Sequence, residues 1–242
     1  MIGALRNVVR ILAGRVRARP EAIRLLVLIQ MEPAKHPWAP FQERARTRPD
    51  DAVSLEMEVI TDPEHPDLDE ITAIDEWHTS KAWSKDRLAE GWRCYTAKHD
   101  GRIAAVGWAA VGLSFRDTYL ERDFKLEPDE AYCTRGFTVA SFRGMGVMRR
   151  LVVHMMLDLT RSSGAMRAVM AVRATNHAMR RTLTAIGWRR VGRMGFVGVF
   201  GMRLHYLVGR QAFPMTKRRT YLDLRRYSAR NRAGAGAART PA

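Results

Sequence analysis

The run of residues with the clearest chemical potential is Ser141–Leu151, which reads SFRGMGVMRRL. It follows a strand-like run, AYCTRGFTV, and precedes a helix-like run, LVVHMMLDLT. The first N–H groups of a helix have no partners inside the helix and lie at the positive end of its dipole, so they attract anions. Gly144 and Gly146 keep side chains away from those donors, and the arginines of the run add positive charge. The spacing predicts a binding site for a phosphate or diphosphate.

Other kinds of site are not indicated by the spacing of residues. The chain has neither the GxxxxGK[ST] loop of nucleotide hydrolases nor a GxGxxG loop with an acidic residue downstream. Cys94, Cys133 and the seven histidines show no spacing typical of a metal site, so we predict no metal and two ordinary buried thiols. Close packing of strand and helix is the alternative explanation for the two glycines, and it stays open at this level.

Two runs, in order, resemble a known family. RGMGVM, which comes after a strand-like run ending in FTV, is similar to the (Q/R)-x-x-G-x-(G/A) loop of the GCN5-related N-acetyltransferase (GNAT) family, with Met148 where glycine or alanine is usual. NHAMRRTLTAIGW resembles the later N-x(10)-G-(F/W) stretch of that family, from Asn176 to Gly187 and Trp188. Together with the elements upstream, the resemblance covers about residues 53–208.

The resemblance implies an acyl-CoA site between two splayed parallel strands, AYCTRGFTV and AMRAVMAVR. Acetyl-CoA would be the cosubstrate, and an N-acetyltransferase would pass its acetyl group to a primary amine of a small molecule or peptide by direct attack in a ternary complex. Asn176 would bond the cofactor arm or help to hold the strands apart, and the N–H of Val139 would stabilise the oxyanion. The pantetheine would pair with the backbone of Phe137, Thr138 and Val139, and the diphosphate would bind N–H groups of Arg143, Gly144, Met145, Gly146, Val147 and Met148.

The residues for proton transfer are less evident. Alternate residues of a strand share a face, and the more polar face of AYCTRGFTV includes Glu130 and Tyr132, our candidates for proton transfer or substrate binding. A solvated strand-start residue is the alternative for Glu130. Leu183 stands where many relatives have a tyrosine that protonates the departing thiolate, and Tyr206 is another candidate acid. Arg135 lies on an apolar face and needs a partner, for which an acidic side chain is the simplest choice.

The elements that must position these residues follow from hydrophobic periodicity. Strand-like and helix-like runs alternate late in the chain, whereas an Asp100-Gly101 turn joins two β-rich runs earlier and is typical of a hairpin. This order predicts a mixed α/β (α+β) fold with a central, mostly antiparallel sheet, a splayed parallel strand pair and flanking helices. The resemblance implies that the first helices after the opening strand shape the acceptor pocket, which Trp77, His78 and Trp83 would then line, although tryptophans are most simply core residues.

Charge divides the chain into three parts. The formal net charge of +16 comes from 41 basic against 25 acidic residues, and much of the excess lies at the two ends. We expect a basic N-terminal extension over residues 1–52, with an amphipathic helix, a strand and a proline-rich loop. An acetyltransferase-like domain over residues 53–208 and a basic, disordered tail over residues 209–242 follow. A catalytically inactive protein that binds nucleic acid or an anionic membrane through these ends is the alternative function.

Location and assembly are less constrained. No run approaches the roughly 20 apolar residues that span a bilayer, and the N-terminal sequence lacks the features of a signal peptide, so we expect a soluble, cytoplasmic protein. The run GFVGVF could form the edge of a homodimer. The acceptor cannot be read from the sequence, since loops such as residues 31–52 and 113–129 would shape its pocket.

Overall fold

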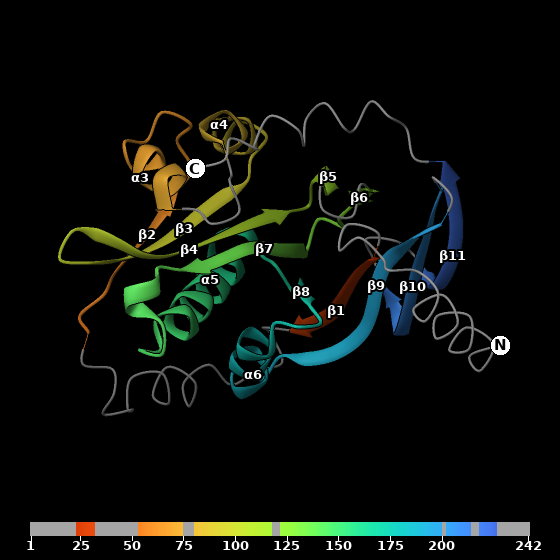
Figure 1. Cartoon of the computed structure of the whole chain (residues 1–242). Helices are drawn as coiled ribbons and strands as arrows, with labels where there is room; N and C mark the ends of the chain where they lie inside the picture. The colour runs from red at the N-terminus through yellow and green to blue at the C-terminus, as the bar shows by residue number, and fades with distance from the viewer. Residues whose placement is uncertain are drawn as a thin grey trace, which may run out of the picture.

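One sheet provides the framework of the protein (Figure 1). The computed structural model describes residues 23–31, 53–74, 80–117, 122–199, 202–213 and 218–226. Nine strands form the sheet, in the order β11-β10-β9-β1-β8-β7-β4-β3-β2. Their bounds are β1 Ile23–Met31, β2 Glu56–Ile60, β3 Arg93–His99, β4 Arg102–Val111, β7 Glu130–Thr138, β8 Arg167–Arg173, β9 Arg189–Val199, β10 Met202–Phe213 and β11 Arg218–Arg226. All neighbours pair antiparallel except β7 and β8, which confirms the predicted fold class.

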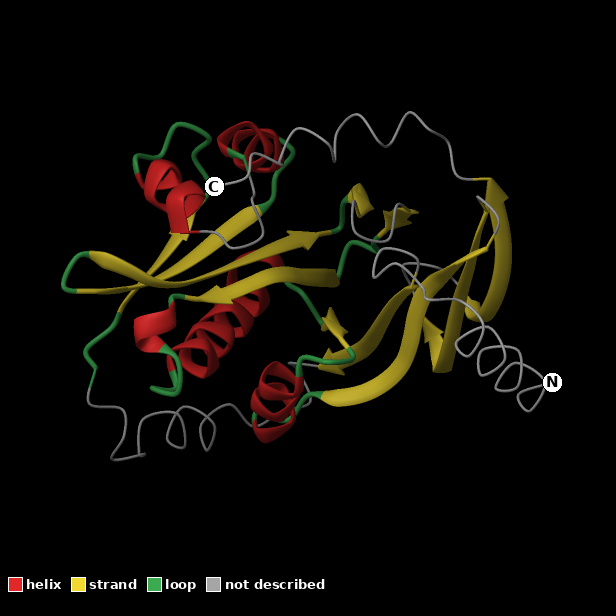
Figure 2. Cartoon of the chain, in the orientation of Figure 1, coloured by secondary structure: helices red, strands yellow, loops and turns green. Residues whose placement is uncertain are grey.

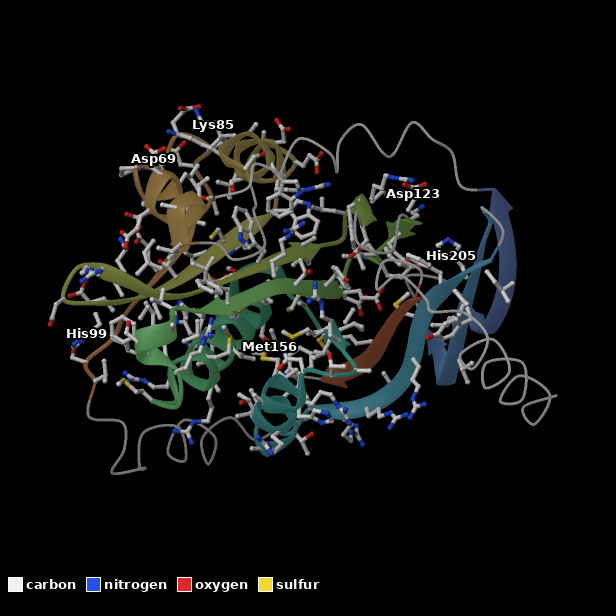
Figure 3. The ribbon with its side chains drawn as sticks, in the orientation of Figure 1. Asp69, Lys85, His99, Asp123, Met156 and His205 are labelled. Atoms are coloured by element: carbon white, nitrogen blue, oxygen red, sulfur yellow. The ribbon has the colours of Figure 1, made fainter. Side chains whose placement is uncertain are left out.

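Helices cover both faces of the sheet (Figure 2). On one face lie α3 (Asp67–Ile74) and α4 (Lys81–Ala89), and on the other lie α5 (Val147–Ser163) and α6 (His177–Ala185). Each face has its own apolar core, and Met156, labelled in Figure 3, belongs to the core beneath α5. Both cysteines are buried thiols, as predicted. Among the described residues, no helix has the length and apolar character needed to cross a membrane.

The β3–β4 hairpin forms as the sequence predicts. Asp100 and Gly101 have φ angles of 49° and 74°. Two successive residues with positive φ are the backbone of a type I′ turn, whose twist matches that of the two strands it joins. Asp and Gly adopt this conformation at low cost, so this turn fixes the register of β3 against β4.

The N-terminal and C-terminal strands differ from the predicted division of the chain. Strand β1 lies inside the predicted extension, yet it occupies the middle of the sheet between β8 and β9. Its apolar run LLVLI, which follows Arg24, is the composition of a central strand, and pairing on both edges satisfies its backbone. The predicted amphipathic helix of residues 1–19 and most of the proline-rich loop lie outside the described residues.

The segment predicted to be a disordered tail also contains strands. Strand β10 continues to Phe213, and β11 pairs with it along nearly its whole length, for instance Leu204 with Leu224. The low apolar content that favoured disorder is outweighed here by pairing with an existing strand, which supplies backbone partners whatever the side chains are. Residues 227–242 lie outside the described part of the chain, so disorder there stays a prediction.

Candidate functional site

A gap opens in the sheet between the two parallel strands. Strands β7 and β8 pair from Glu130 with Arg167 to Cys133 with Met170, and both strands then continue without pairing to each other. Beyond that point, β7 remains paired with β4 up to Thr138, while β8 remains paired with β1. Each strand follows its other neighbour, and the natural twist of the sheet then carries the two strands apart.

A bulge in β7 marks the start of the gap. The register between β4 and β7 shifts where Arg135 and Gly136 together lie opposite Gly107. Arg135 has a φ of 49°, a conformation that costs a residue with a side chain about 1 kcal/mol or more. A Cβ at Gly107 on β4 would lie 2.9 Å from the Sδ of Met155 on α5, so this glycine lets the helix approach β4 closely, opposite the bulge. Bulges bend a strand and redirect its side chains, and this one does both beside the gap.

A pocket lies in this gap. Its lining includes Tyr132 and Ala171, which pack in the core on the α3–α4 face, and Met170 and Val172, which belong to the core on the α5 face. The pocket therefore reaches from one face of the sheet toward the other. The rest of its lining is Asp117, Thr134, Arg135, Gly136, Arg173, Asn176 and Met179.

The backbone along β7 offers donors to the gap, but not at all the predicted positions. The N–H of Val139 donates to the carbonyl of Ala104 on β4 at 2.9 Å. The predicted oxyanion role of this N–H is therefore not supported, because the sheet already uses it. Since successive residues of a strand face opposite edges, Phe137 also faces β4, whereas Gly136 and Thr138 face the gap.

The glycine-rich loop has the geometry of an anion site. Gly144 and Gly146 have φ angles of 85° and 74°, which residues with a side chain rarely adopt. Gly146 is the N-cap of α5, and its carbonyl accepts the N–H of Arg150 at 3.1 Å. The N–H groups of the first helical turn precede that bond and lack partners within the helix. A Cβ added at Gly144 would meet nothing within 4 Å, so this glycine is required by the backbone rather than by packing.

The arginines near the loop are held by carbonyl groups. Arg143 Nε donates to the carbonyl of Thr138 at 3.1 Å, and Arg150 donates to the carbonyl of Val53 at 2.7 Å. Arg180 on α6 donates to the carbonyl of Ala174 at 2.9 Å. A carbonyl group carries no net charge, so the contacts of Arg150 and Arg180 orient these two guanidinium groups without neutralising them. The N–H of Arg143 donates to Ala140, which restricts the predicted diphosphate donors to the residues that follow it.

Met148, which departs from the family pattern, has a clear packing role. A Cβ built on Gly136 would lie 3.6 Å from the Sδ of Met148 and 3.6 Å from the Cε of Met179. The two methionines, from α5 and α6, thus lie over the bare backbone of β7 at the edge of the gap. A long, flexible side chain on the helix complements a glycine on the strand.

Asn176 has two structural roles, as the cap of a helix and as part of the pocket wall. It is the N-cap of α6, where its Oδ1 accepts the N–H of Met179 at 3.0 Å, and it also lines the pocket. Its side-chain oxygen is therefore engaged in capping, which leaves the amide nitrogen as the group that can donate to a ligand.

Sequence reasoning missed Asp117, which lies at the end of β5 (Ser114–Asp117). Its Oδ2 accepts the hydroxyl proton of Tyr132 at 2.9 Å, and it is the carboxylate that the described residues contribute to the pocket lining. Burial, followed by the negative charge of Asp117, raises the pKa of Tyr132 well above its usual value. Tyr132 therefore remains a protonated donor. No sequence pattern links these two residues, because only the fold of the intervening hairpin brings them together.

That hairpin is fastened to β7 by aromatic rings. Phe115 on β5 and Phe124 on β6 (Arg122–Lys125) stack on Tyr132 with centroid distances of 5.0 and 6.3 Å. Asp123, labelled in Figure 3, accepts a hydrogen bond from Arg116 across the hairpin at 3.1 Å. The predicted loop of residues 113–129 is thus partly ordered, and it presents Asp117 to the gap.

The other candidates for proton transfer lie away from the pocket lining. Glu130 is almost fully buried at the start of β7, and Arg167 lies 3.6 Å from its Oε1. Burial raises the pKa of Glu130 to about 7. Tyr206 lies on β10, three strands from β8, where burial raises its pKa to about 12. Leu183 is fully buried in the core, so that position has no acid.

Three of the tryptophans form an edge-to-face cluster on the α4 side. Trp83 contacts Trp92 and Trp108 with centroid distances of 6.4 and 5.1 Å. Trp92, Trp108 and Trp188 are buried core residues, as the simpler interpretation predicted, whereas Trp83 is half-buried. Arg135, which the sequence left in need of a partner, places its guanidinium 4.5 Å from the ring centroid of Trp83. Trp77 and His78 lie outside the described residues.

Three side chains of kinds that can bind a metal ion lie close together at β2, the strand at one edge of the sheet. Glu58, His65 and Asp67 bring possible ligand atoms within 4.8 Å of one another. Lys98 forms ion pairs with Glu58 at 2.8 Å and with Asp67 at 2.5 Å. Because an ammonium group already balances these carboxylates, we assign the cluster a structural role.

Comparisons with known proteins place this arrangement in context. A profile described as the Acetyltransferase (GNAT) family matches residues 55–188, more than half of the chain. A tandem GNAT protein from the clavulanic acid biosynthesis pathway has a TM-score of 0.50 and 17% identity, over 71% of this chain and 51% of that one. A GCN5-related N-acetyltransferase from Kribbella flavida gives 0.46 and 14%, over 69% and 55%. The ribosomal-protein-S18-alanine N-acetyltransferase from Escherichia coli gives 0.42 and 18%, over 55% and 77%.

At these low sequence identities, the similarity to the solved structures shows the fold alone. The chain spans only about half the length of several of the structures that it matches. No curated protein matches it in sequence.

A variant of Glu130 tests whether this buried carboxyl group affects the stability of the fold. Its folded-state pKa of about 7 exceeds the ordinary value of 4.5, so its contribution to stability is complete below pH 4.5 and is lost as the pH rises through 7. Glu130→Gln removes this loss. The variant should gain stability relative to the parent between pH 5 and 8, by up to about 3 kcal/mol, in urea unfolding at several pH values. Parallel stability profiles for the two proteins would contradict this assignment.

Asn176 offers a second test, which separates capping from ligand binding. Asn176→Asp keeps a good capping oxygen but removes the amide donor and adds negative charge beside an anion site, whereas Asn176→Ala removes the cap. We expect Asn176→Asp to unfold at nearly the parental temperature and to bind CoA at least about tenfold more weakly, a loss of about 1.4 kcal/mol. Asn176→Ala should lose about 1 kcal/mol of stability. Unchanged CoA affinity in Asn176→Asp, measured by calorimetry, would remove Asn176 from the binding site.

Proposed function

The chain belongs to the Acetyltransferase (GNAT) family, and on this premise we propose that it is an acetyl-CoA-dependent N-acetyltransferase. Acetyl-CoA would supply an activated acetyl group as a thioester. The acceptor would be a primary amine that attacks directly in a ternary complex. The observation that carries the proposal is the position of the pocket in the gap between β7 and β8, on the strand that leads into the glycine-rich start of α5.

The geometry supports a specific division of labour for the cofactor. The N–H groups from Gly144 through the first turn of α5 would bind the diphosphate, with φ angles at both glycines that keep the donors clear. The pantetheine arm would run along the edge of β7 that β8 has left, where Gly136 and Thr138 present backbone groups. A donor on that edge, rather than the N–H of Val139, would stabilise the oxyanion that develops in acyl transfer.

The acceptor side needs a group that handles the amine. A free amine is protonated near neutral pH, so it must lose a proton before its nitrogen attacks the acetyl carbon. Asp117 is the candidate that binds the ammonium and takes up this proton, directly or through water. Its carboxylate can accept from Tyr132 and from the amine at the same time, since it has about four acceptor positions. The amine nitrogen attacks the acetyl carbon and gives a tetrahedral oxyanion. Its collapse breaks the C–S bond, and the remaining excess proton on the nitrogen passes to the departing thiolate or to water.

The leaving group needs little assistance. Thiols have a pKa near 8.5, so a thiolate is a stable enough product near neutral pH to leave without a strong acid beside it. This accounts for a leucine at position 183, deep in the core, where relatives have tyrosine. Tyr206 is not required either. Cytoplasmic location, a homodimer and an anionic partner for the basic ends remain further proposals.

The glycine loop provides the central test. Gly146→Val should weaken acetyl-CoA binding by at least about tenfold, because the added side chain crowds the N–H donors. Gly164→Val is the matched control: Gly164 caps the other end of α5 with a similar φ of 65° and has nothing within 4 Å of a Cβ. Both variants should lose a similar 1–2 kcal/mol or so of stability, since valine is strained at positive φ.

Calorimetric titration with acetyl-CoA, together with thermal unfolding, separates the two effects. Equal cofactor affinity in Gly146→Val and Gly164→Val would contradict the diphosphate assignment. A thiol-release assay with a panel of amines should then show turnover in the parent and in Gly164→Val, with little in Gly146→Val.

A further inference from the structure

Two small side chains lie at the closed end of the gap. Strands β7 and β8 make their last pair at Cys133 and Met170, so Thr134 and Ala171 are the next residues along the two strands and no longer pair. Tyr132 and Ala171 pack in the core on the α3–α4 face. Since alternate residues of a strand share a face, Thr134 lies on that face as well. Both small side chains line the pocket.

Methionines cover the opposite face of the gap. A Cβ built on Gly136 would lie 3.6 Å from the Sδ of Met148 and 3.6 Å from the Cε of Met179. Met170 belongs to the buried core on the same α5 face. A ligand at the closed end therefore meets long thioether side chains toward α5, and only small side chains toward α3 and α4.

An aromatic ring limits the depth of the pocket on the α3–α4 face. Tyr132 is almost fully buried, and its hydroxyl donates to Asp117 at 2.9 Å and accepts a hydrogen bond from Thr134. Phe115 and Phe124 stack on the tyrosine ring with centroid distances of 5.0 and 6.3 Å. The ring cannot move aside without breaking these contacts, so it forms a fixed end wall.

The cofactor would approach this end of the gap along β7. The strand leads from Thr138 to the glycine-rich start of α5, so a diphosphate bound there lies beyond the open end of the gap. The pantetheine arm would run back along the edge of β7, past Gly136 and toward Thr134. The pair of Cys133 and Met170 then blocks the way between the strands. The acyl chain must therefore leave the plane of the sheet, on the face where the side chains are small.

The size of the pocket suits an acyl chain of more than two carbons. Its volume is about 110 Å³. An apolar cavity of about 150 Å³ in a protein takes up benzene, so by proportion this pocket holds about four non-hydrogen atoms. An acetyl group would leave part of that space empty, and about one or two further methylene groups would fill it.

We propose that the donor is not restricted to acetyl-CoA, and that the site prefers CoA esters of short, unbranched acyl chains, propionyl and butyryl. Thr134 and Ala171 leave the space for the chain, and the ring of Tyr132 ends it. The transfer step is unchanged, since only the chain on the carbonyl carbon is longer. This inference rests on the proposed acyl transfer from CoA and adds the class of donor to it.

The experiment measures how tightly CoA esters of increasing chain length bind. Free CoA and its acetyl, propionyl, butyryl, pentanoyl and octanoyl esters are titrated calorimetrically without an acceptor, so the acceptor need not be known. In the parent, each methylene group from acetyl to butyryl should tighten binding by about fourfold, as expected for its burial. The pentanoyl and octanoyl esters should bind no more tightly than the butyryl ester, because Tyr132 ends the pocket.

Two substitutions at the closed end should change the preferred length in opposite directions. Ala171→Val adds two methyl groups to the wall, so butyryl-CoA should bind no more tightly than acetyl-CoA. Thr134→Ser keeps the hydroxyl that bonds to Tyr132 but removes a methyl group, so pentanoyl-CoA should now bind about fourfold more tightly than butyryl-CoA. Affinities are compared within each variant, so that a general loss of CoA binding cancels.

Ala174→Val is the matched control. Ala174 directly follows β8, is partly buried against the core on the α5 face, and is not part of the pocket lining. This variant gains the same two methyl groups and should keep the parental dependence on chain length. Thermal unfolding checks that every variant is folded. If Ala171→Val does not fold, the parent and Thr134→Ser still decide the question.

Three results would overturn the inference. The first is a parent that binds acetyl-CoA at least as tightly as propionyl-CoA and butyryl-CoA. The second is a folded Ala171→Val variant, or a Thr134→Ser variant, that keeps the parental dependence on chain length. The third is a parental affinity that still rises from butyryl to octanoyl, since Tyr132 would then not end the pocket. A parent that binds neither CoA nor any of its esters would instead overturn the proposed function, and this inference with it.

Discussion

The site depends on the limited pairing of two parallel strands. Strands β7 and β8 share four paired positions, and each then follows its outer neighbour, β4 or β1. Backbone groups on the facing edges no longer pair across the gap beyond that point, and each needs another donor or acceptor, as the carbonyl of Thr138 has in Arg143. A ligand that extends between the strands can supply those partners. The gap, the bulge and the helix that begins with glycine all follow from this one interruption of the sheet.

Sequence patterns found the parts of the site that depend on local backbone requirements. Gly144 and Gly146 were identified because glycine is needed where φ is positive at a helix start. Asn176 was identified because the run that it begins resembles a stretch of the GNAT family, and it is the N-cap of α6. Asp117 was missed, since its partnership with Tyr132 depends on how a hairpin packs against a distant strand. The sheet edge that the N–H of Val139 faces also could not be predicted, because the bulge at Arg135 and Gly136 sets the alternation of the residues that follow it.

In the fold, too, features set by local sequence could be predicted, and features set by contacts between distant segments could not. The order of elements and the hairpin at Asp100 and Gly101 follow from periodicity and turn chemistry. The place of β1 does not, since an apolar strand near the N-terminus can join any edge that lacks a partner. The departure at Met148 shows how a local mismatch with a family pattern can be balanced elsewhere. Its thioether packs over Gly136, so the bulky side chain on the helix faces a strand residue that has none.

The central position of β1 has a consequence for how the chain folds. Its partners β8 and β9 are far away in sequence, so the contacts that hold one side of the gap have a high contact order. During synthesis β1 leaves the ribosome early, and its partners are completed only after most of the remaining chain. Until then an apolar strand has two open edges, which can pair wrongly. β1, which holds one side of the site, therefore pairs only late in synthesis, when β8 and β9 are complete.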